Sequence, residues 1–185
     1  MSLLLTTACG AEIQWGDEMG LRSDHHAGRT YGRRGQTPVV PGTGQRFRCN
    51  VISAVSNRGR LAFMVFRHGF NAGTFLRFLR RLLRLATRRV FLIVDGHPAH
   101  RAKRVTTWVA AHADRLRLFF LPGYSPELNP DEYLNHDVKA NAVGRQRAHD
   151  VDELVTNVRN YLRVTQRRPT CVRRYFQAPS VRYAA

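Results

Sequence analysis

The pattern of apolar and polar positions predicts strands early in the chain and helices later. The stretch EIQW alternates and runs into GDEMG, which is typical of a strand that ends at an acidic loop, with Asp17 at the end of the strand. RFRCNVISAVS and LAFMVF flank a turn signal at residues 57–60, which predicts an antiparallel hairpin. Between these segments, residues 24–44 contain five glycines and two prolines, so we expect a long surface loop or hairpin there.

The period of the pattern changes from two to 3.6 over residues 71–89, which predicts an amphipathic helix. Its apolar face would hold Ala72, Phe75, Leu79, Leu82 and Ala86, and its basic face Arg77, Arg81, Arg84 and Arg88. The basic face suits DNA phosphates, but a charged face opposite an apolar one is also what an ordinary surface helix shows.

The next apolar run, VFLIVDG, is typical of a strand buried on both faces and ends at Asp95. We expect a helix over residues 102–113, a second buried strand at LRLFFLP, and helices over 130–143 and 151–165. Three antiparallel strands followed by a parallel pair predict an α/β protein, an RNase H-like mixed sheet flanked by helices.

The length of 185 residues suits one main domain with its own core. We expect an N-terminal tail at 1–10, the RNase H-like domain at 11–148, and a helical extension of the same domain at 149–185. No apolar stretch is long enough for a membrane span, and the three cysteines contain no C-x-x-C pair. A cytoplasmic protein without disulfides is therefore expected.

Charge indicates the class of partner. Lys plus Arg number 30 against 13 Asp plus Glu, a formal net charge of +17, and all the basic residues except Lys103 and Lys139 are arginines. Arginine suits bidentate phosphate contacts. A biased genome also produces arginine-rich chains, so charge alone indicates nucleic-acid binding and nothing finer.

Acidic residues mark the candidate chemistry. In the predicted sheet, the ends of neighbouring central strands place Asp17 and Asp95 side by side, and such a pair usually implies bound cations or a shared proton. Oxygen-rich sites select Mg²⁺ or Mn²⁺. In LPGYSPELNPDEYLNHDVK, Asn129 and Pro130 open a helix, and Glu132 fits a capping box, which its spacing alone favours. Asp131 fits the favourable end of the helix dipole.

The segments WGDEMG, FLIVDGHPAH and LPGYSPELNPDEYLNHDVK together resemble the catalytic core of bacterial insertion-sequence transposases of the Tc/mariner superfamily. The similarity runs from about Glu12 into the C-terminal helices. In that family the first acid lies in a D-E dipeptide after a strand, and the second begins a D-x-x-x-x-H element. The third acid lies two residues after the sequence L-N-P. The resemblance therefore implies a DDE triad of Asp17, Asp95 and Glu132.

The implied activity is metal-dependent DNA cleavage and strand transfer of an insertion sequence with two Mg²⁺ or Mn²⁺ ions, Asp17 bridging them. The implied partners are DNA, as transposon ends and target, and a second copy or full-length transposase, with the protein associated with the nucleoid. Such transposases carry helix-turn-helix units before the catalytic domain. Here Asp17 comes almost at the start, so we expect a catalytic half that can be inactive in isolation.

Further nucleic-acid contacts are expected at Arg101, Lys103, Lys139, Tyr124 and His100, the last either bonding within its loop or touching the scissile phosphate. Glu18 should point away from the face of Asp17. A zinc site at His97 and His100 lacks further ligands at suitable spacing, and Trp108 suits either base stacking or packing.

Two other functions stay open. One is an RNase H-like nuclease without strand transfer, and the other is an inactive truncated transposase that acts as a DNA-binding inhibitor.

Overall fold

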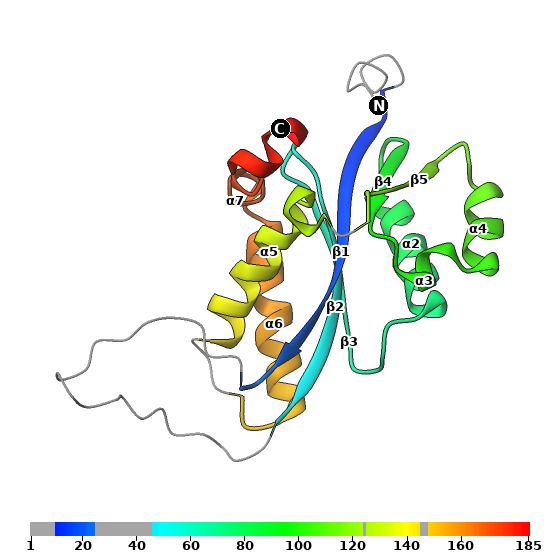
Figure 1. Cartoon of the computed structure of the whole chain (residues 1–185). Helices are drawn as coiled ribbons and strands as arrows, with labels where there is room; N and C mark the ends of the chain where they lie inside the picture. Colours follow the sequence, from blue (N-terminus) through cyan, green and yellow to red (C-terminus); the bar gives the residue numbers. More distant parts are fainter. Residues whose placement is uncertain (1–9, 25–45, 124, 145–147) are drawn as a thin grey trace.

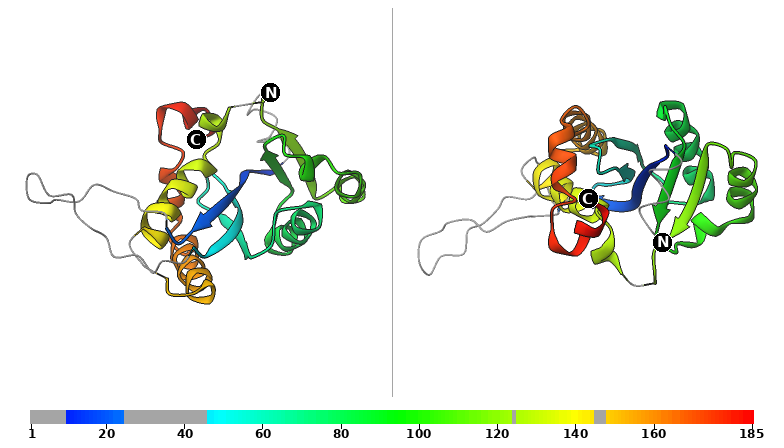
Figure 2. Two further views of the ribbon diagram at one scale, coloured as in Figure 1. Left: turned by 60° about the horizontal axis from the view of Figure 1, so that its bottom comes forward. Right: turned by 90° about the horizontal axis from the view of Figure 1, so that it is seen from above.

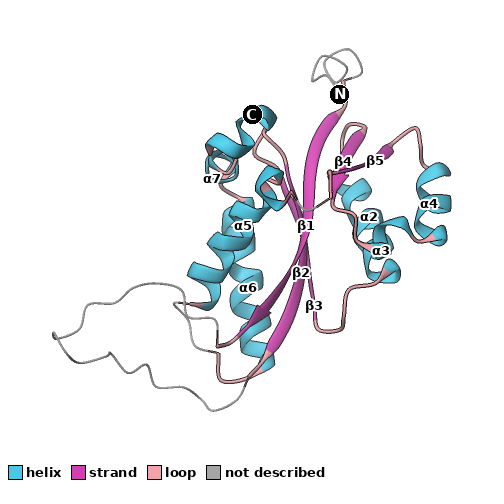
Figure 3. Ribbon diagram, viewed as in Figure 1, coloured by secondary structure: helices cyan, strands magenta, loops and turns pink. Residues whose placement is uncertain are grey.

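A computed structural model describes residues 10–24, 46–123, 125–144 and 148–185, and it shows one five-stranded sheet with helices on both faces (Figures 1 and 3). The strand order is β3-β2-β1-β4-β5. β1 pairs antiparallel with β2 and parallel with β4, while β2–β3 is antiparallel and β4–β5 parallel. The strands are β1 (Glu12–Arg22), β2 (Arg48–Val55), β3 (Leu61–Phe66), β4 (Val90–Val94) and β5 (Leu116–Phe120). The predicted mixed sheet is confirmed.

β1 differs from the expectation that it ends before an acidic loop. It runs on through GDEMG, because β2 continues to pair with it as far as Arg22↔Arg48 after the pairing with β4 has stopped at Trp15↔Ile93. Asp17 therefore lies in the middle of an 11-residue strand, opposite Ser53. The two glycines that suggested a turn, Gly16 and Gly20, belong to the strand.

The helices follow the predicted order with shifted ends. α2 ends at Leu85 rather than residue 89, because Ala86 is already extended and the carbonyl of Arg89 accepts the N–H of Glu12 at the start of the sheet. The helical segments are α2 (Ala72–Leu85), α3 (Pro98–Arg101), α4 (Lys103–Ala110), η1 (Pro126–Leu128), α5 (Asp131–Val138), the π-helical η2 (Lys139–Val143), α6 (Val151–Gln166), α7 (Pro169–Arg174) and η3 (Pro179–Ala184).

Two hydrophobic cores lie on opposite faces of the sheet (Figure 2). On one face, α5, α6 and α7 pack on β1 to β3, with Trp15 against Phe176 at 5.3 Å between ring centroids. On the other face, α2 covers β2, β3 and β4 with the apolar stripe expected from its period, including Phe75, Leu79 and Leu82. The sheet thus lies between two helical layers and contributes residues to both cores.

β5 was expected to be buried on both faces, and this is wrong. It forms the edge of the sheet, so Leu116 at its start is fully buried while Phe120 at its end is 39% exposed. Leu116 and Leu118 pack in the core that α2 covers, and Phe119 contacts Phe91 with 5.4 Å between ring centroids.

No helix in the described part of the chain is long and apolar enough to cross a membrane. Cys49 and Cys171 are free thiols. The predicted surface loop and the third cysteine, Cys9, fall in residues 1–9 and 25–45, outside the described ranges.

Candidate active site

The parallel register of β1 and β4 brings the first two acids to the same end of the sheet. Trp15 is the partner of Ile93 where this pairing ends, and Asp17 and Asp95 each follow two residues later in their own segments. Both side chains line one cavity of about 430 Å³, and Glu132 of α5 lines it as well. Three acids that are far apart in the sequence therefore share one hollow.

Asn129 attaches the start of α5 to β1. Its buried side chain accepts a hydrogen bond from the N–H of Asp131 at 3.1 Å and donates one to the carbonyl of Gly16 at 3.3 Å. Because Gly16 directly precedes Asp17, this link sets the first turn of α5 beside the first acid. A Cβ on Gly16 would lie 3.0 Å from the Ser53 carbonyl, so the strands also approach closely there.

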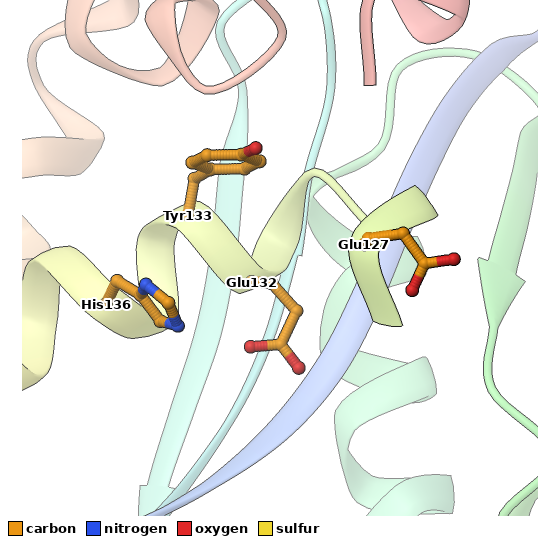
Figure 4. A pocket seen from close by; sticks show the side chains of 4 residues that line it. All are labelled: Glu127, Glu132, Tyr133 and His136. Atoms are coloured by element: carbon orange, nitrogen blue, oxygen red, sulfur yellow. The ribbon is translucent and has the colours of Figure 1, made fainter. Parts of the chain in front are cut away.

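Glu132 faces the cavity and not the cap. Its carboxylate lies 3.4 Å from the amide nitrogen of Asn135, and within the described ranges it accepts no hydrogen bond from the backbone of Asn129. The capping role that spacing alone favours is therefore not what the structure shows. Glu132 also lines a neighbouring hollow of about 410 Å³ with Glu127, Tyr133 and His136, so it separates two cavities (Figure 4).

Asp17 is surrounded by negative charge. Its carboxylate accepts hydrogen bonds from the Asn135 amide and from the N–H of Glu18, both at 2.9 Å. Burial, together with the negative charges of Glu132 and Asp95, raises the pKa of Asp17 to about 7. A divalent cation would relieve this repulsion.

Asp131 is a buried acid whose surroundings the sequence did not reveal. Its side chain is fully buried, and the Ser53 hydroxyl donates to one oxygen at 2.7 Å, while the other oxygen has no hydrogen-bond partner among the described residues. Burial and the charge of Asp17 raise the pKa of Asp131 well above its usual value. The pattern showed only that an acid suits a first helical turn, and that signal says nothing about burial.

Asp95 has the opposite environment. His100 lies with Nδ1 2.9 Å from the carboxylate, the N–H of His97 donates at 3.1 Å, and the pKa of Asp95 is lowered mainly through the His100 hydrogen bond. His100 is 2% exposed and packs against Phe75 at 4.4 Å between ring centroids. Of its two expected roles, the structure favours bonding within its loop.

The other expected nucleic-acid contacts are scattered. The Arg101 guanidinium lies 4.5 Å from the ring centroid of Phe120, and it comes near Gly96 at the cavity. Lys103 and Lys139 begin α4 and η2, and in the described part of the chain neither borders the hollow with the three acids. Tyr124 lies outside the described residues.

Known proteins share both sequence features and the fold of this chain. The sequence profile of the family described as "DDE superfamily endonuclease" matches residues 12–155. The chain belongs to this family. Its fold is similar to the Mos1 mariner paired end complex with Mn, with a TM-score of 0.71 and 17% identity over 93% of this chain and 53% of that one. It is also similar to the catalytic domain of Mos1 mariner transposase, with a TM-score of 0.59 and 15% identity over 92% and 81% of the two chains.

A third similar structure is the Mos1 strand transfer complex, with a TM-score of 0.65 and 17% identity over 94% of this chain and 55% of that one. The DDE endonuclease chain thus spans about half the length of the transposase in these complexes. No curated protein sequence matches it. The RNase H-like fold and the DDE endonuclease family predicted from the sequence are confirmed.

The donor chemistry of this DDE endonuclease suits a hard divalent cation, since three carboxylates line one cavity. Within the described residues, however, no three His, Cys, Asp or Glu side chains are gathered closely enough to surround one ion. The Asp95 carboxylate lines the cavity and is also bonded to His100. A zinc site at His97 and His100 is disfavoured, since in the described part of the chain no third His, Cys, Asp or Glu joins them around one ion.

Proposed function

We propose that this chain is the catalytic domain of a mariner-type transposase, and that Asp17, Asp95 and Glu132 are its catalytic acids. The observation that carries the proposal is the convergence of these acids from β1, the end of β4 and the start of α5 on one cavity. Membership of the DDE endonucleases supports it, because that family implies a carboxylate triad.

The same three acids would hold two Mg²⁺ or Mn²⁺ ions. Bound there, such ions activate a water nucleophile and stabilise the leaving oxygen of the phosphodiester. The raised pKa of Asp17, caused by burial and neighbouring carboxylates, supports a site where a cation is favoured over three free charges. The similar Mos1 paired end complexes are complexes with Mn and with Mg, which supports the same cations here.

Residues around the triad form hydrogen bonds with its acids. Asn135 donates to Asp17, and His100 keeps Asp95 ionised through its Nδ1–H. Arg101 is the proposed phosphate contact, which its position over Phe120 and near Gly96 at the cavity supports. Lys103, Lys139 and Tyr124 stay proposals for phosphate and base contacts further out.

DNA is the proposed substrate, as transposon end and as target, and a second copy or full-length transposase is the proposed protein partner. The net charge of +17 supports binding through phosphates, which position a protein but carry little base information. Binding by this chain should therefore depend steeply on salt and weakly on sequence. The Mos1 relatives include a strand transfer complex, which supports strand transfer over simple hydrolysis.

The test compares the unmodified chain with Asp95→Asn, with a helix-turn-helix module supplied by fusion or in trans. Mn²⁺-supported nicking and joining of a labelled end to plasmid are measured together. We expect both activities from the unmodified protein and neither from the variant. Nicking without joining would favour the nuclease, and DNA binding without nicking would favour the inhibitor. Equal nicking by both proteins would remove Asp95 from the site.

A further inference from the structure

A further hollow, lined mainly by basic residues, lies on the helical layer of α2 and α4. Its volume is about 640 Å³. We call it the arginine groove, and it is lined by Met64, Arg77, Arg80, Arg81, Leu83, Arg84, Trp108, His112 and Arg115. In the described part of the chain it shares no residue with the cavity of the three acids.

The charges of the groove are not neutralised within the protein. α2 contains no Asp or Glu, and Arg80, Arg81 and Arg84 form no salt bridge with any described carboxylate. Arg115 is held in place by the Leu83 carbonyl at 2.6 Å, so it adds a fixed positive charge. Like charges three and four residues apart destabilise a helix. A groove built this way is suited to a polyanion.

Trp108 in the arginine groove argues that the groove contacts the phosphate backbone of DNA and not its bases. Trp108 is stacked on His112, with ring centroids 4.0 Å apart and an interplanar angle of 25°. One face of the indole is therefore covered, and an open stacking platform of the kind that binds single-stranded bases is not presented on that side. Arginine forks remain as the main recognition groups, and these suit phosphates.

The groove is connected to the candidate active site through α2. His100, which bonds Asp95, packs on Phe75 in the first turn of α2. From Phe75 to Arg84 the helix axis advances roughly 13 Å at its usual rise per residue. That is about four base-pair steps of a duplex. DNA with a phosphate at the cavity can therefore reach the arginines.

We infer that the arginine groove binds the phosphodiester backbone of double-stranded DNA that extends from the cavity of the three acids. This inference rests on the proposed function, because it takes DNA as the substrate. The groove supplies affinity and direction to the bound duplex, and sequence reading is no part of its role. Its arginines neutralise phosphates that the three acids would repel.

The test is a triple variant, Arg80→Ala with Arg81→Ala and Arg84→Ala, and a control triple, Arg167→Ala with Arg168→Ala and Arg173→Ala. The control residues are exposed at the end of α6 and in α7, on the other face of the sheet, and remove the same charge. Binding to a random-sequence duplex is titrated with salt in EDTA. At about 0.9 per phosphate, the slope of log affinity against log salt should fall by about 2.7 for the groove triple only.

Equal slopes for the two triples would overturn the inference, as would tighter binding of duplex RNA than of duplex DNA. Replacing the same three arginines by lysine should keep most of the slope of log affinity against log salt, because the positive charge is retained. If the lysine variant loses the slope as completely as the alanine variant, the phosphate contact is refuted. If the alanine triple variant has a lower melting temperature than the unmodified protein, the single variant Arg81→Ala replaces it. That variant should lower the slope by about 0.9.

Failure of the groove and failure of the proposed function are separable, because binding in EDTA needs no catalytic metal. Asp95→Asn should bind DNA with the unmodified slope. If the unmodified protein cuts DNA but the groove triple binds normally, only the groove fails. If the groove triple loses slope while no protein cuts DNA, the groove stands and the catalytic proposal fails.

Discussion

The amide of Asn135 donates a hydrogen bond to the carboxylate of Asp17 at 2.9 Å, across the junction of α5 and β1. The same nitrogen lies 3.4 Å from the Glu132 carboxylate, one helical turn earlier. A single buried amide therefore bridges two acids from different elements. Within the described ranges its own side-chain oxygen has no hydrogen-bond partner, so the side chain is held chiefly by the acids that it bridges.

Asn135→Ala should weaken Mn²⁺ binding or nicking by roughly 10- to 100-fold, the usual effect of removing a group that orients metal ligands. Asn141→Ala is the matched control, since Asn141 bonds Asp137 at 2.7 Å and touches none of the three acids. Metal titrations of both variants measure the difference. Equal losses would mean that Asn135 does not position Asp17.

The stability of the metal-free protein should fall as pH rises from about 4 to about 7. Asp17 has a folded pKa of about 7 against 3.8 when unfolded, so the folded state binds more protons across that range. The change should be on the order of 2–4 kcal/mol. Asp131, with a pKa also raised, acts in the same direction. Denaturant unfolding at several pH values measures it, and a flat or rising profile would contradict it.

Mn²⁺ should stabilise the protein more at pH 8 than at pH 6, because the cation and the proton compete for Asp17. Thermal melting with and without Mn²⁺ gives the shift at each pH. NaCl at matched ionic strength serves as the control for screening. The Asp17→Asn variant should lose most of the pH dependence of the Mn²⁺ effect; if it keeps that dependence, another group is the competing site.

Replacing the two aspartates by asparagine should affect metal-free stability differently. Asp17→Asn removes a carboxylate that burial and neighbours hold at high energy, so Tm should rise above pH 7. Asp95→Asn removes one that His100 stabilises, so Tm should not rise. Both variants should lose cleavage. Differential scanning calorimetry in EDTA checks the contrast, and a rise in Tm for Asp95→Asn alone would reverse the assignment.

Gly16→Ala should destabilise the fold by about 1–3 kcal/mol, because its Cβ would lie 3.0 Å from the Ser53 carbonyl and 3.3 Å from Leu92 Cδ1. Gly20→Ala is the control on the same strand, where the nearest atom is 3.5 Å away. Unfolding in urea compares the two. Comparable losses would show that β propensity, and not close packing beside Asp17, determines the effect.

The sheet order and helix sequence were predictable because apolar periodicity records burial directly. The period of two over β2 and β3, and the period of 3.6 over α2, each matched the faces that pack. The end of β1 was not predictable in this way. Whether GDEMG turns or continues depends on β2, a strand that lies beyond residues 25–45 in the sequence.

The site was predictable only in part, for a similar reason. Resemblance pointed to Asp17, Asp95 and Glu132, whereas spacing alone favoured a cap at Glu132. Asn135 and Asp131 were missed because their significance comes from contacts with β1 and β2, across more than seventy residues of chain. Local patterns contain no information on such partners.

The last helical segment, η3, also determines how the three acids can be adjusted. Tyr183 donates to the Leu128 carbonyl at 2.6 Å, and the Ser180 hydroxyl lies 3.0 Å from that of Tyr133, so η3 braces both η1 and the start of α5. Asp17 lies in β1 and Asp95 directly follows β4, whereas Glu132 lies on this braced turn of α5. A displacement of η3 would therefore move Glu132 relative to the two aspartates and change the distances among the three acids.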